Sequence, residues 1–417
     1  MMPAFRAAGV DLIGALRDVS RSATARSRTR GALVAVQVAL SLVLLAGSGL
    51  FLRSLANAVR TPLGFRPDGI VTASVNLGLV RYGEERASLF YPAAIGRVRA
   101  MPGVTSAAWA SVLPTVGRMT WSVDIEGHTP PAGESPNVHA SHVGAEFFRT
   151  LGSRVTSGRE FERTDAPGQP VAVINDTMAR LYWPGRNPIG GRVRIFERWL
   201  TIVGTVEDTK VQELEEPAVP YVYLMFDQWL GGRQSIATDM AHLFVRTAGD
   251  ERPLVAATRA ILKSVDPQLP WFFVRPFEDV VANMRMPQRM GATLFAIFSV
   301  LAITLAAVGI YGVASYVGAL RTREMGIRVA LGAARADILA LVLRQGLTPV
   351  WIGIASGLLL AYWAGRAAAT FLYAVSPTDP LTFGAVALLL AAIALGATYA
   401  PARRAAAVDP VHALRYE

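Results

Sequence analysis

The sequence of 417 residues has no cysteine and only two lysines, Lys210 and Lys263. The absence of cysteine excludes disulfide frameworks, thiolate zinc sites, iron–sulfur clusters and cysteine nucleophiles. Charged residues are also scarce, at 17% of the chain against about 25% in a typical soluble domain. Because 52% of the residues are hydrophobic, this balance favours a membrane protein with part of its length outside the bilayer.

The position of the two lysines excludes a P-loop in this chain. A P-loop needs a lysine directly after a glycine, where it reaches the phosphates of the nucleotide. Here Lys210 follows Thr209 and Lys263 follows Leu262. The sequence also has no GxSxG nucleophile elbow and no HExxH zinc motif. We therefore expect no enzyme here, and no catalytic, cofactor-binding or metal-binding residue in this chain.

The histidine pattern does not change that expectation. His139 and His142 form an H-x-x-H pattern beside Pro136, Asn137 and Ser141. Two histidines without carboxylate partners make an incomplete metal site. We interpret this stretch as a solvated strand or loop.

Four long stretches carry no charged side chain. A helix needs about 20 apolar residues to cross a bilayer, and Gln37 is the one strongly polar side chain in the first stretch. That stretch holds 22 residues, more than the roughly 7–15 of a signal peptide, so we expect an anchor. Ionisable residues inside spans usually mark ion pathways, and none lies in these four, which argues against a proton-driven carrier. The predicted spans are 31–52, 290–320, 345–365 and 380–402.

The positive charge is concentrated beside these spans. Segments 1–30, 319–344 and 401–417 hold 14 arginines against six acidic residues, which is +8 of the net +10. Basic residues flank spans on the cytoplasmic side. We therefore expect both termini and the loop between the second and third spans in the cytoplasm. The charge indicates topology and not a nucleic-acid surface, because the basic cluster of residues 17–30 abuts a span and has no aromatic residue between its arginines.

The predicted layout places one large domain outside the membrane. Residues 9–20 have helical apolar spacing and suit an amphipathic helix on the inner membrane face, or otherwise a frayed leader. The expected segments are a cytoplasmic amphipathic and basic segment 1–30, the first span, an extracytoplasmic domain 53–289, the second span, a cytoplasmic loop 321–344, the third span, an extracytoplasmic loop 366–379, the fourth span and a cytoplasmic tail 403–417.

The large domain has the pattern of an α+β fold. Residues 70–77 alternate as in a half-buried strand, and a helix at about 84–100 and a strand near 105–112 follow. The same order returns near 242–275, so the two β-α-β units predict a split βαβ subdomain. Between them we expect an inserted smaller subdomain at about 143–235, with turns at its Pro and Gly positions.

The cytoplasmic loop has the features of a short presented helix. Glu324 and Arg328 form an i,i+4 pair in the favourable order. Gly332 is placed to end a helix with a left-handed cap, and a new helix near Ala334 leads into the third span. A partner protein could push such a helix, although an ordinary charged connection has the same composition.

Several motifs resemble the FtsX-like permease family, and specifically the MacB-type ABC transporter permeases. They cover nearly the whole chain, and the first span with its approach resembles the middle of the duplicated permeases of this group. Those have two four-span halves, and this chain resembles the second half. The matching stretches are REMGIR (323–328), ALGA (330–333), DIL (337–339), the ending 401–417, EFFRTLG (146–152), SGREF (157–161), PVAVIN (170–175), YWPGRNPIGGRV (182–193) and residues 22–55.

The resemblance implies a four-span permease subunit of an ABC transporter in a bacterial cytoplasmic membrane. A separate cytoplasmic ATPase would bind ATP–Mg, and its hydrolysis would move the extracytoplasmic domain, either for efflux or for mechanical transmission. A homodimer, or one copy with a related permease half, would make the working transporter. The alternatives are a membrane-anchored receptor or scaffold without an ATPase, and a membrane hydrolase. By motif match, the ATPase-contacting residues would be Arg323, Glu324, Gly326, Arg328, Leu331 and Gly332.

Overall fold

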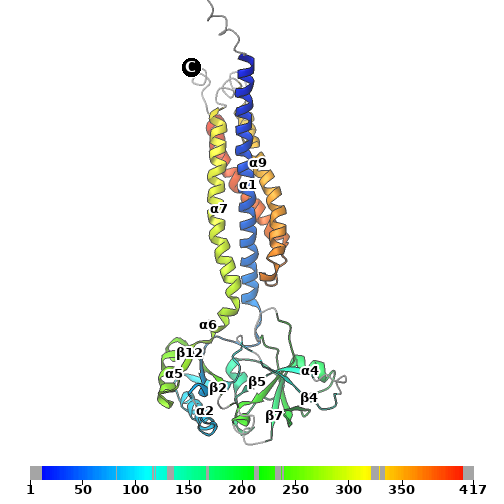
Figure 1. Ribbon diagram of the computed structural model, residues 1–417, viewed down its shortest axis with the longest axis vertical. Helices are drawn as coiled ribbons and strands as arrows, with labels where there is room; N and C mark the ends of the chain where they lie inside the picture. Colours follow the sequence, from blue (N-terminus) through cyan, green and yellow to red (C-terminus); the bar gives the residue numbers. More distant parts are fainter. Residues whose placement is uncertain are drawn as a thin grey trace, which may run out of the picture. The chain divides into compact units, whose positions relative to one another are not determined.

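A computed structural model of the chain contains two compact units. One is a helix unit made of Met1–Val59 and Pro287–Glu417, and the other is a sheet domain, Arg60–Met286 (Figure 1). Within the helices only the backbone is described for residues 12–28, 317–320, 335 and 405–406. The structure describes residues 12–406 apart from 81, 115–116, 118, 129–135, 166–168, 211–215, 231–235, 237–238, 321–327 and 329–333.

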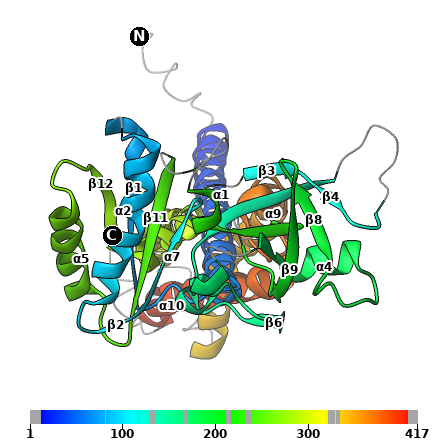
Figure 2. The same cartoon turned by 90° about the horizontal axis from the view of Figure 1, so that it is seen from below.

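One part of the sheet domain is a four-stranded antiparallel sheet in the order β12-β1-β11-β2. The unit β1-α2-β2 therefore interlocks with the unit β11-α5-β12, which is the split βαβ arrangement. Figure 2 shows α2 and α5 together on one side of these strands. The elements are β1 Ile70–Asn76, α2 Glu84–Arg99, β2 Val104–Ala110, β11 Met240–Thr247, α5 Arg252–Val265 and β12 Trp271–Pro276.

The second part of the sheet domain is inserted between β2 and β11. It joins β2 through the single pair Ala110↔Val143 and continues in the order β5-β10-β7-β9-β8-β4, with β3 on β5 and β6 on β9. The insertion thus runs from residue 111 to residue 239, wider than the expected 143–235, because β3, β4 and β5 already belong to it. Its elements are β3 Met119–Ser122, β4 Asp124–Ile125, β5 Asn137–Val143, α3 Phe147–Leu151, β6 Val155–Gly158, β7 Val171–Asn175, α4 Asp176–Tyr182, β8 Arg192–Ile195, β9 Arg198–Val206 and β10 Tyr221–Met225.

The core of the sheet domain explains why β1 forms, and it corrects one expectation. Val71, Ala73 and Val75 are fully buried in the cluster that also contains residues of α2 and α5. The alternation predicts a half-buried strand, yet Thr72 and Ser74 on the other face are also buried. Short elements, including α6 (Phe277–Ala282), pack against this strand. The strand is therefore enclosed on both faces despite its polar residues.

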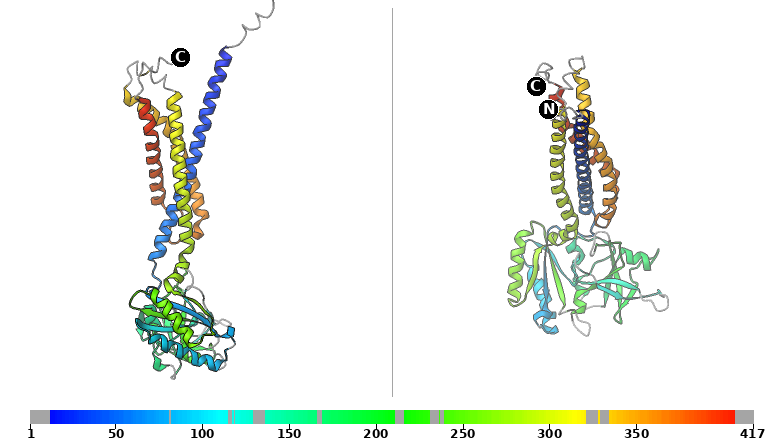
Figure 3. Two further views of the ribbon diagram at one scale, coloured as in Figure 1. Left: turned by 90° about the vertical axis from the view of Figure 1, so that its left-hand side faces the viewer. Right: turned by 45° about the horizontal axis from the view of Figure 1, so that its top comes forward.

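The described part of the helix unit contains four long helices and, within them, four stretches long and apolar enough to cross a membrane. Each corresponds to one of the charge-free stretches of the sequence. Only 17–50% of the most apolar window of each stretch is buried, as expected for helices that face lipid. The helices, shown from two sides in Figure 3, are α1 Leu12–Arg60, α7 Met286–Leu320, α9 Arg335–Ala367 and α10 Pro380–Ala406, and the spans are Thr29–Arg60, Phe277–Tyr316, Ala336–Ala367 and Pro380–Arg404.

The first helix differs from the expectation for the N-terminal segment. We expected an amphipathic helix at residues 9–20, separate from the span at 31–52. Instead α1 runs without a break from Leu12 to Arg60, over 49 residues. Residues 15–30 contain neither proline nor glycine, so nothing in that stretch interrupts a helix that continues into the span.

Candidate functional site

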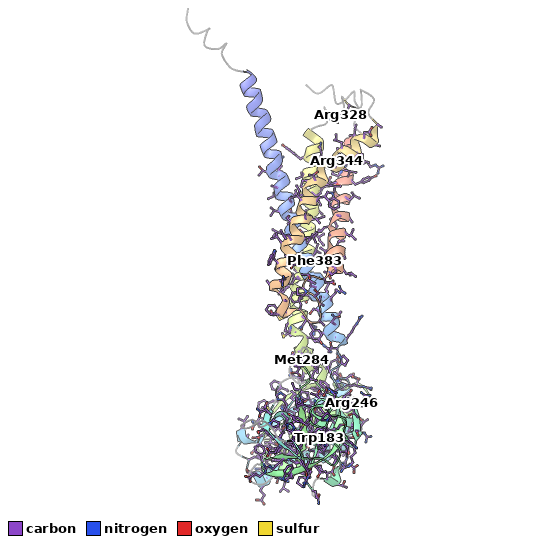
Figure 4. The ribbon with its side chains drawn as sticks, turned by 90° about the vertical axis from the view of Figure 1, so that its right-hand side faces the viewer. Trp183, Arg246, Met284, Arg328, Arg344 and Phe383 are labelled. Atoms are coloured by element: carbon purple, nitrogen blue, oxygen red, sulfur yellow. The ribbon has the colours of Figure 1, made fainter. Side chains whose placement is uncertain are left out.

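The predicted ATPase-contacting residues lie between α7, which ends at Leu320, and α9, which begins at Arg335. Of these residues the structure describes Arg328, which is exposed and helical. Figure 4 shows Arg328 and Arg344 at the same end of the helix unit. The other predicted residues, Arg323, Glu324, Gly326, Leu331 and Gly332, lie outside the described residues, so their role stays a prediction.

Helix α1 packs closely against α9 through two glycines. A Cβ atom on Gly353 would stand 2.6 Å from the carbonyl oxygen of Ala35, and one on Gly357 would stand 2.9 Å from the Cα atom of Ala39. Both distances are too short for a larger side chain without a shift of the helices. The GxxxG spacing therefore marks a helix-packing seam, as small residues do in membrane helices.

Helix α1 also packs against α7, and this seam contains buried hydroxyl groups. Ser41 donates from its hydroxyl to the Ala302 carbonyl oxygen at 3.1 Å, and Ser299 donates to the Leu44 carbonyl oxygen at 3.1 Å. The Phe51 and Phe295 rings stack with their centroids 5.2 Å apart. The two helices that connect the helix unit to the sheet domain along the chain are thus joined by polar and aromatic contacts.

The loop between α9 and α10 is attached to the end of α1. Arg53 forms an ion pair with Asp379, Asn57 donates to the Ala374 carbonyl oxygen at 2.8 Å, and Tyr373 N–H donates to Ser54 Oγ at 2.8 Å. Asp379 also caps the start of α10, because its carboxylate accepts hydrogen bonds from Thr382.

That carboxylate is held in its charged form. Asp379 Oδ2 accepts from Thr382 Oγ1 at 2.5 Å and from Thr382 N–H at 2.9 Å. These bonds, with the Arg53 guanidinium, hold the pKa of Asp379 below its usual range. Sequence reasoning missed this role, although an aspartate before Pro380 with a threonine at 382 is an N-cap signature.

The chain that follows α1 is fixed to the sheet domain by Arg246 on β11. Its guanidinium donates to the carbonyl oxygens of Thr150, Arg66 and Asp68 at 2.6, 2.8 and 3.2 Å. Burial lowers the pKa of this guanidinium, which stays charged because an arginine pKa lies so high. Figure 4 labels Arg246 within the sheet domain. The contact ties the entry segment 61–69 to α3 and β11, and no sequence pattern had indicated it.

The two histidines of the H-x-x-H pattern do not share a site. Both lie on β5, three positions apart, so they occupy opposite faces of the strand. His139 Nδ1 lies 2.9 Å from Thr120 Oγ1, whereas His142 is completely buried, and burial lowers its pKa to about 3. Among the residues that the structure describes, no group of three or more histidine, aspartate or glutamate side chains is placed to hold a metal.

A buried serine–histidine pair bears on the hydrolase alternative. Ser74 Oγ lies 2.7 Å from His242 Nδ1, across neighbouring strands. Both residues are buried, and within the described residues no ion pair joins an acidic side chain to His242. A nucleophile must reach its substrate and needs an oriented base, so this buried pair is a strand-to-strand hydrogen bond.

Comparison with protein families identifies both units. The model of the MacB-like periplasmic core domain matches residues 32–262, more than half of the chain. The model of the FtsX-like permease C-terminal region matches residues 296–410. The two matches therefore include most of the sheet domain and at least part of every membrane-spanning helix, and they leave out residues 263–295 with β12 and α6.

Curated relatives point to the same group. The chain is 29% identical over 322 residues to the macrolide export ATP-binding/permease protein MacB of Agrobacterium fabrum, covering 73% of this chain and 46% of that protein. It is 27% identical over 293 residues to the MacB of Hahella chejuensis, covering 67% and 43%. A probable export ATP-binding/permease protein of Pseudomonas fluorescens is 25% identical over 373 residues, covering 82% and 56%. The chain thus spans about half the length of these relatives.

Solved structures include similar domains. The periplasmic region of MacB from Actinobacillus actinomycetemcomitans is 14% identical, with a TM-score of 0.38, and covers 55% of this chain and 97% of that one. The extracellular domain of the noncanonic ABC-type transporter YknZ from Gram-positive bacteria is 13% identical, with a TM-score of 0.34, and covers 49% and 100%. From the family matches to both units, the chain belongs to the FtsX-like permeases with a MacB-like periplasmic core domain.

Proposed function

We propose that this chain is the transmembrane permease subunit of an ABC transporter and works with a separate cytoplasmic ATPase. ATP–Mg binds to that ATPase, and hydrolysis moves the sheet domain on the other side of the membrane. Both termini and the 321–344 loop face the cytoplasm, in keeping with the positive charge of those segments. The membrane is a bacterial cytoplasmic membrane.

The observation that carries this proposal is the α1–α7 seam. Along the chain, α1 leads directly into the sheet domain and α7 leads directly out of it. The 321–333 segment begins where α7 ends, so a partner that pushes this segment acts on a helix joined to α1 through Ser41 and Ser299. A push at one end of α7 is thereby passed to both connections with the sheet domain. Such transmission needs no passage of substrate between the helices.

The need for a separate motor rests on the sequence of this chain. Neither Lys210 nor Lys263 follows a glycine, so no P-loop is present. The relatives are named ATP-binding/permease proteins, and this chain matches only part of their length. The ATP-binding part therefore lies outside these 417 residues, and we propose that a separate ATPase supplies it.

A second permease half completes the transporter. Helix α7 exposes an apolar stripe along successive turns, formed by Leu294, Ile297, Leu301, Leu305 and Val308. Such a stripe faces either lipid or a neighbouring helix of a second copy or of a related half. We propose the pairing, because a symmetrical pair of permeases matches the two nucleotide sites of an ATPase dimer.

The first test is whether a gene next to this one encodes a protein with a P-loop. The full chain is then purified with that protein, and ATPase activity is measured. We expect the ATPase to co-purify and its activity to respond to the permease. The double substitution Glu324→Ala with Arg328→Ala should weaken the complex or uncouple ATP hydrolysis. The matched control is Glu251→Ala with Lys263→Ala at the ends of α5 in the sheet domain, which should leave both properties unchanged.

The same experiment separates the alternative of a receptor or scaffold. A receptor without an ATPase predicts no co-purifying ATPase and no difference between the two double variants. Unchanged association and unchanged ATP hydrolysis in the Glu324→Ala, Arg328→Ala protein would remove the coupling role from the 321–333 segment.

A further inference from the structure

One end of the helix unit holds an arginine of α10 hydrogen-bonded to a tyrosine of α7. Arg404 Nη1 donates to Tyr311 Oη at 3.1 Å, and Figure 3 shows these two helix ends side by side. Arg404 and Tyr316 are the last residues of two of the four stretches that can cross a membrane. The pair therefore lies where a span ends, at the level where tyrosine side chains meet the lipid headgroups.

The Arg404–Tyr311 pair can donate to a further acceptor. A guanidinium has five N–H groups, and the bond to Tyr311 uses one of them. The hydroxyl group accepts this bond, so its own hydrogen can still be donated. Both side chains are exposed. A phosphodiester beside the pair can therefore receive charge-assisted bonds from Arg404, which are stronger than bonds between neutral groups, together with a bond from the hydroxyl.

The excess of arginine near this end favours an anion, whichever ion pairs form there. Arg30 on α1 lies over the Tyr316 ring, 3.9 Å from its centroid, so arginines of three helices meet the surface at this end. The arginine-rich segments 1–30, 319–344 and 401–417 hold 14 arginines and six acidic residues. If every one of those acidic residues paired with an arginine, eight arginines would still have no acidic partner among them. Such basic surfaces at the ends of spans attract anionic lipid headgroups.

The surface that continues from the pair along both helices is apolar. On α7, Thr304 and Val300 lie two and three turns from Tyr311 on the same side of the helix, and on α10 Ala400 lies one turn from Arg404. All three are exposed, and Thr304 Oγ1 donates to the Val300 carbonyl oxygen at 2.8 Å. None of them belongs to the α7 stripe assigned above to a second permease half. Hydrocarbon chains can therefore lie here without facing a polar group that lacks a partner.

We propose that the Arg404–Tyr311 pair binds the phosphodiester group of an anionic phospholipid, whose acyl chains lie along α7 and α10. A zwitterionic lipid fits less well, because its cationic amine would lie beside the excess arginines. The site goes beyond the proposed coupling to an ATPase and does not depend on it, since binding involves the helix unit alone. A bound lipid would bridge α10 to α7, the helix that leads out of the sheet domain along the chain.

Arg403 provides a matched control within the same helix. It is exposed and has the same charge as Arg404, but it points about 100° away around the helix axis, as successive residues of a helix do. The bond to Tyr311 belongs to Arg404. Arg403→Gln and Arg404→Gln therefore remove the same charge from the same end of α10, and only the second breaks the pair.

The test is native mass spectrometry of the delipidated full chain in a nonionic detergent, titrated with dioleoyl phosphatidylglycerol or dioleoyl phosphatidylcholine. We expect the first phosphatidylglycerol to bind about tenfold more tightly than the first phosphatidylcholine. Arg404→Gln should weaken phosphatidylglycerol binding about tenfold, the loss expected for charge-assisted bonds, and Arg403→Gln about twofold, as for one exposed charge. Tyr311→Phe keeps every charge and should weaken binding about threefold, because it removes a neutral hydrogen bond.

Two results would overturn the proposal. Equal affinity of the unchanged chain for the two lipids would exclude recognition of the charge. Equal losses in Arg404→Gln and Arg403→Gln would exclude the pair as the site and leave only general attraction by the basic end. The melting temperature of each variant in the same detergent distinguishes loss of the fold from loss of the lipid, and no nucleotide is present, so the result is independent of the ATPase.

A soluble headgroup separates the lipid from a free phosphate. In about tenfold excess over phosphatidylglycerol, sn-glycerol 3-phosphate should leave the bound lipid in place, because it has no acyl chains to pack along the helices. Displacement of the lipid by this anion would show that the phosphate alone is bound, and it would overturn the assignment of a phospholipid.

Discussion

Gly353 on α9 lies so close to α1 that a Cβ atom at this position would stand 2.6 Å from the carbonyl oxygen of Ala35. We predict that Gly353→Ala destabilises the helix unit by about 1–3 kcal/mol, because the backbone oxygen cannot move away without shifting α1. The measurement is the apparent melting temperature of the full chain in one detergent.

The control for that substitution is Gly396 on α10. Apart from its chain neighbours and the backbone of its own helix, no heavy atom of the described structure lies within 4 Å of a Cβ at this position. Gly396→Ala should therefore be neutral or stabilise the helix by about 0.5–1 kcal/mol, as alanine does within helices. If both variants melt at the same temperature, the α1–α9 seam is less tight than the distances indicate.

The second prediction concerns Asp379, which both begins α10 and pairs with Arg53. Asp379→Ala should cost about 1 kcal/mol, since it removes the N-cap acceptor. Asp379→Asn should cost less, because asparagine caps a helix equally well and the half-exposed ion pair contributes under about 1 kcal/mol.

A double-mutant cycle separates the two roles of Asp379. Arg53→Met should lower the melting temperature of the unchanged chain and have no effect when Asp379→Asn is already present. If Arg53→Met has the same effect in both backgrounds, the ion pair adds nothing and Arg53 acts through other contacts.

The third prediction concerns Arg246, whose guanidinium donates to three carbonyl oxygens of the entry segment and α3. Arg246→Met should destabilise the sheet domain by about 2–4 kcal/mol, because it removes three charge-assisted bonds at once. Arg246→Lys should give an intermediate loss, since an ammonium cannot reproduce the planar fork. Pulse proteolysis of the full chain in urea measures both.

The exposed Arg186 provides the comparison for Arg246. Arg186→Met should change the stability of the sheet domain by no more than about 0.5 kcal/mol. A loss in Arg246→Met no larger than in Arg186→Met would show that water replaces the guanidinium at these carbonyls.

The sequence predicted the parts of this fold that depend on a single physical requirement. A bilayer-spanning helix needs about 20 apolar residues, so all four spans could be located from charge-free stretches alone. The Gly353-x-x-x-Gly357 spacing is typical of closely packed membrane helices, and both glycines lie against α1. The order of β-α-β elements indicated a split βαβ part, although it contained no information on which strands pair.

The contacts that sequence reasoning missed join residues far apart in the chain. Arg53 and Asp379 are separated by 326 positions, and Arg246 reaches carbonyls that any residue type could provide. The burial of Thr72 and Ser74 was also missed, because alternation describes one strand and not the elements that cover it. The predicted ATPase-contacting residues from Arg323 to Gly332 stay predictions, since a motif implies a partner only by resemblance.

The last prediction is a loss of stability of the sheet domain in acid. Burial lowers the pKa of His142 to about 3 and that of His242 to about 4, whereas a histidine in the unfolded chain has a pKa of about 6.5. Both histidines are therefore neutral in the folded domain at pH 5, while the unfolded chain binds protons there. Their contribution to stability is fully present above about pH 6.5 and is lost as the pH falls toward 4 and then 3, by at most about 1.4 kcal/mol per pH unit for each histidine.

The slope of unfolding free energy against pH identifies the groups responsible. His242→Asn keeps a partner for Ser74 but removes a titrating group, so between pH 6 and pH 4 its slope should be smaller than that of the unchanged chain by up to one proton. Equal slopes in His242→Asn and in the unchanged chain would mean that His242 takes up its proton in the folded domain as readily as in the unfolded chain.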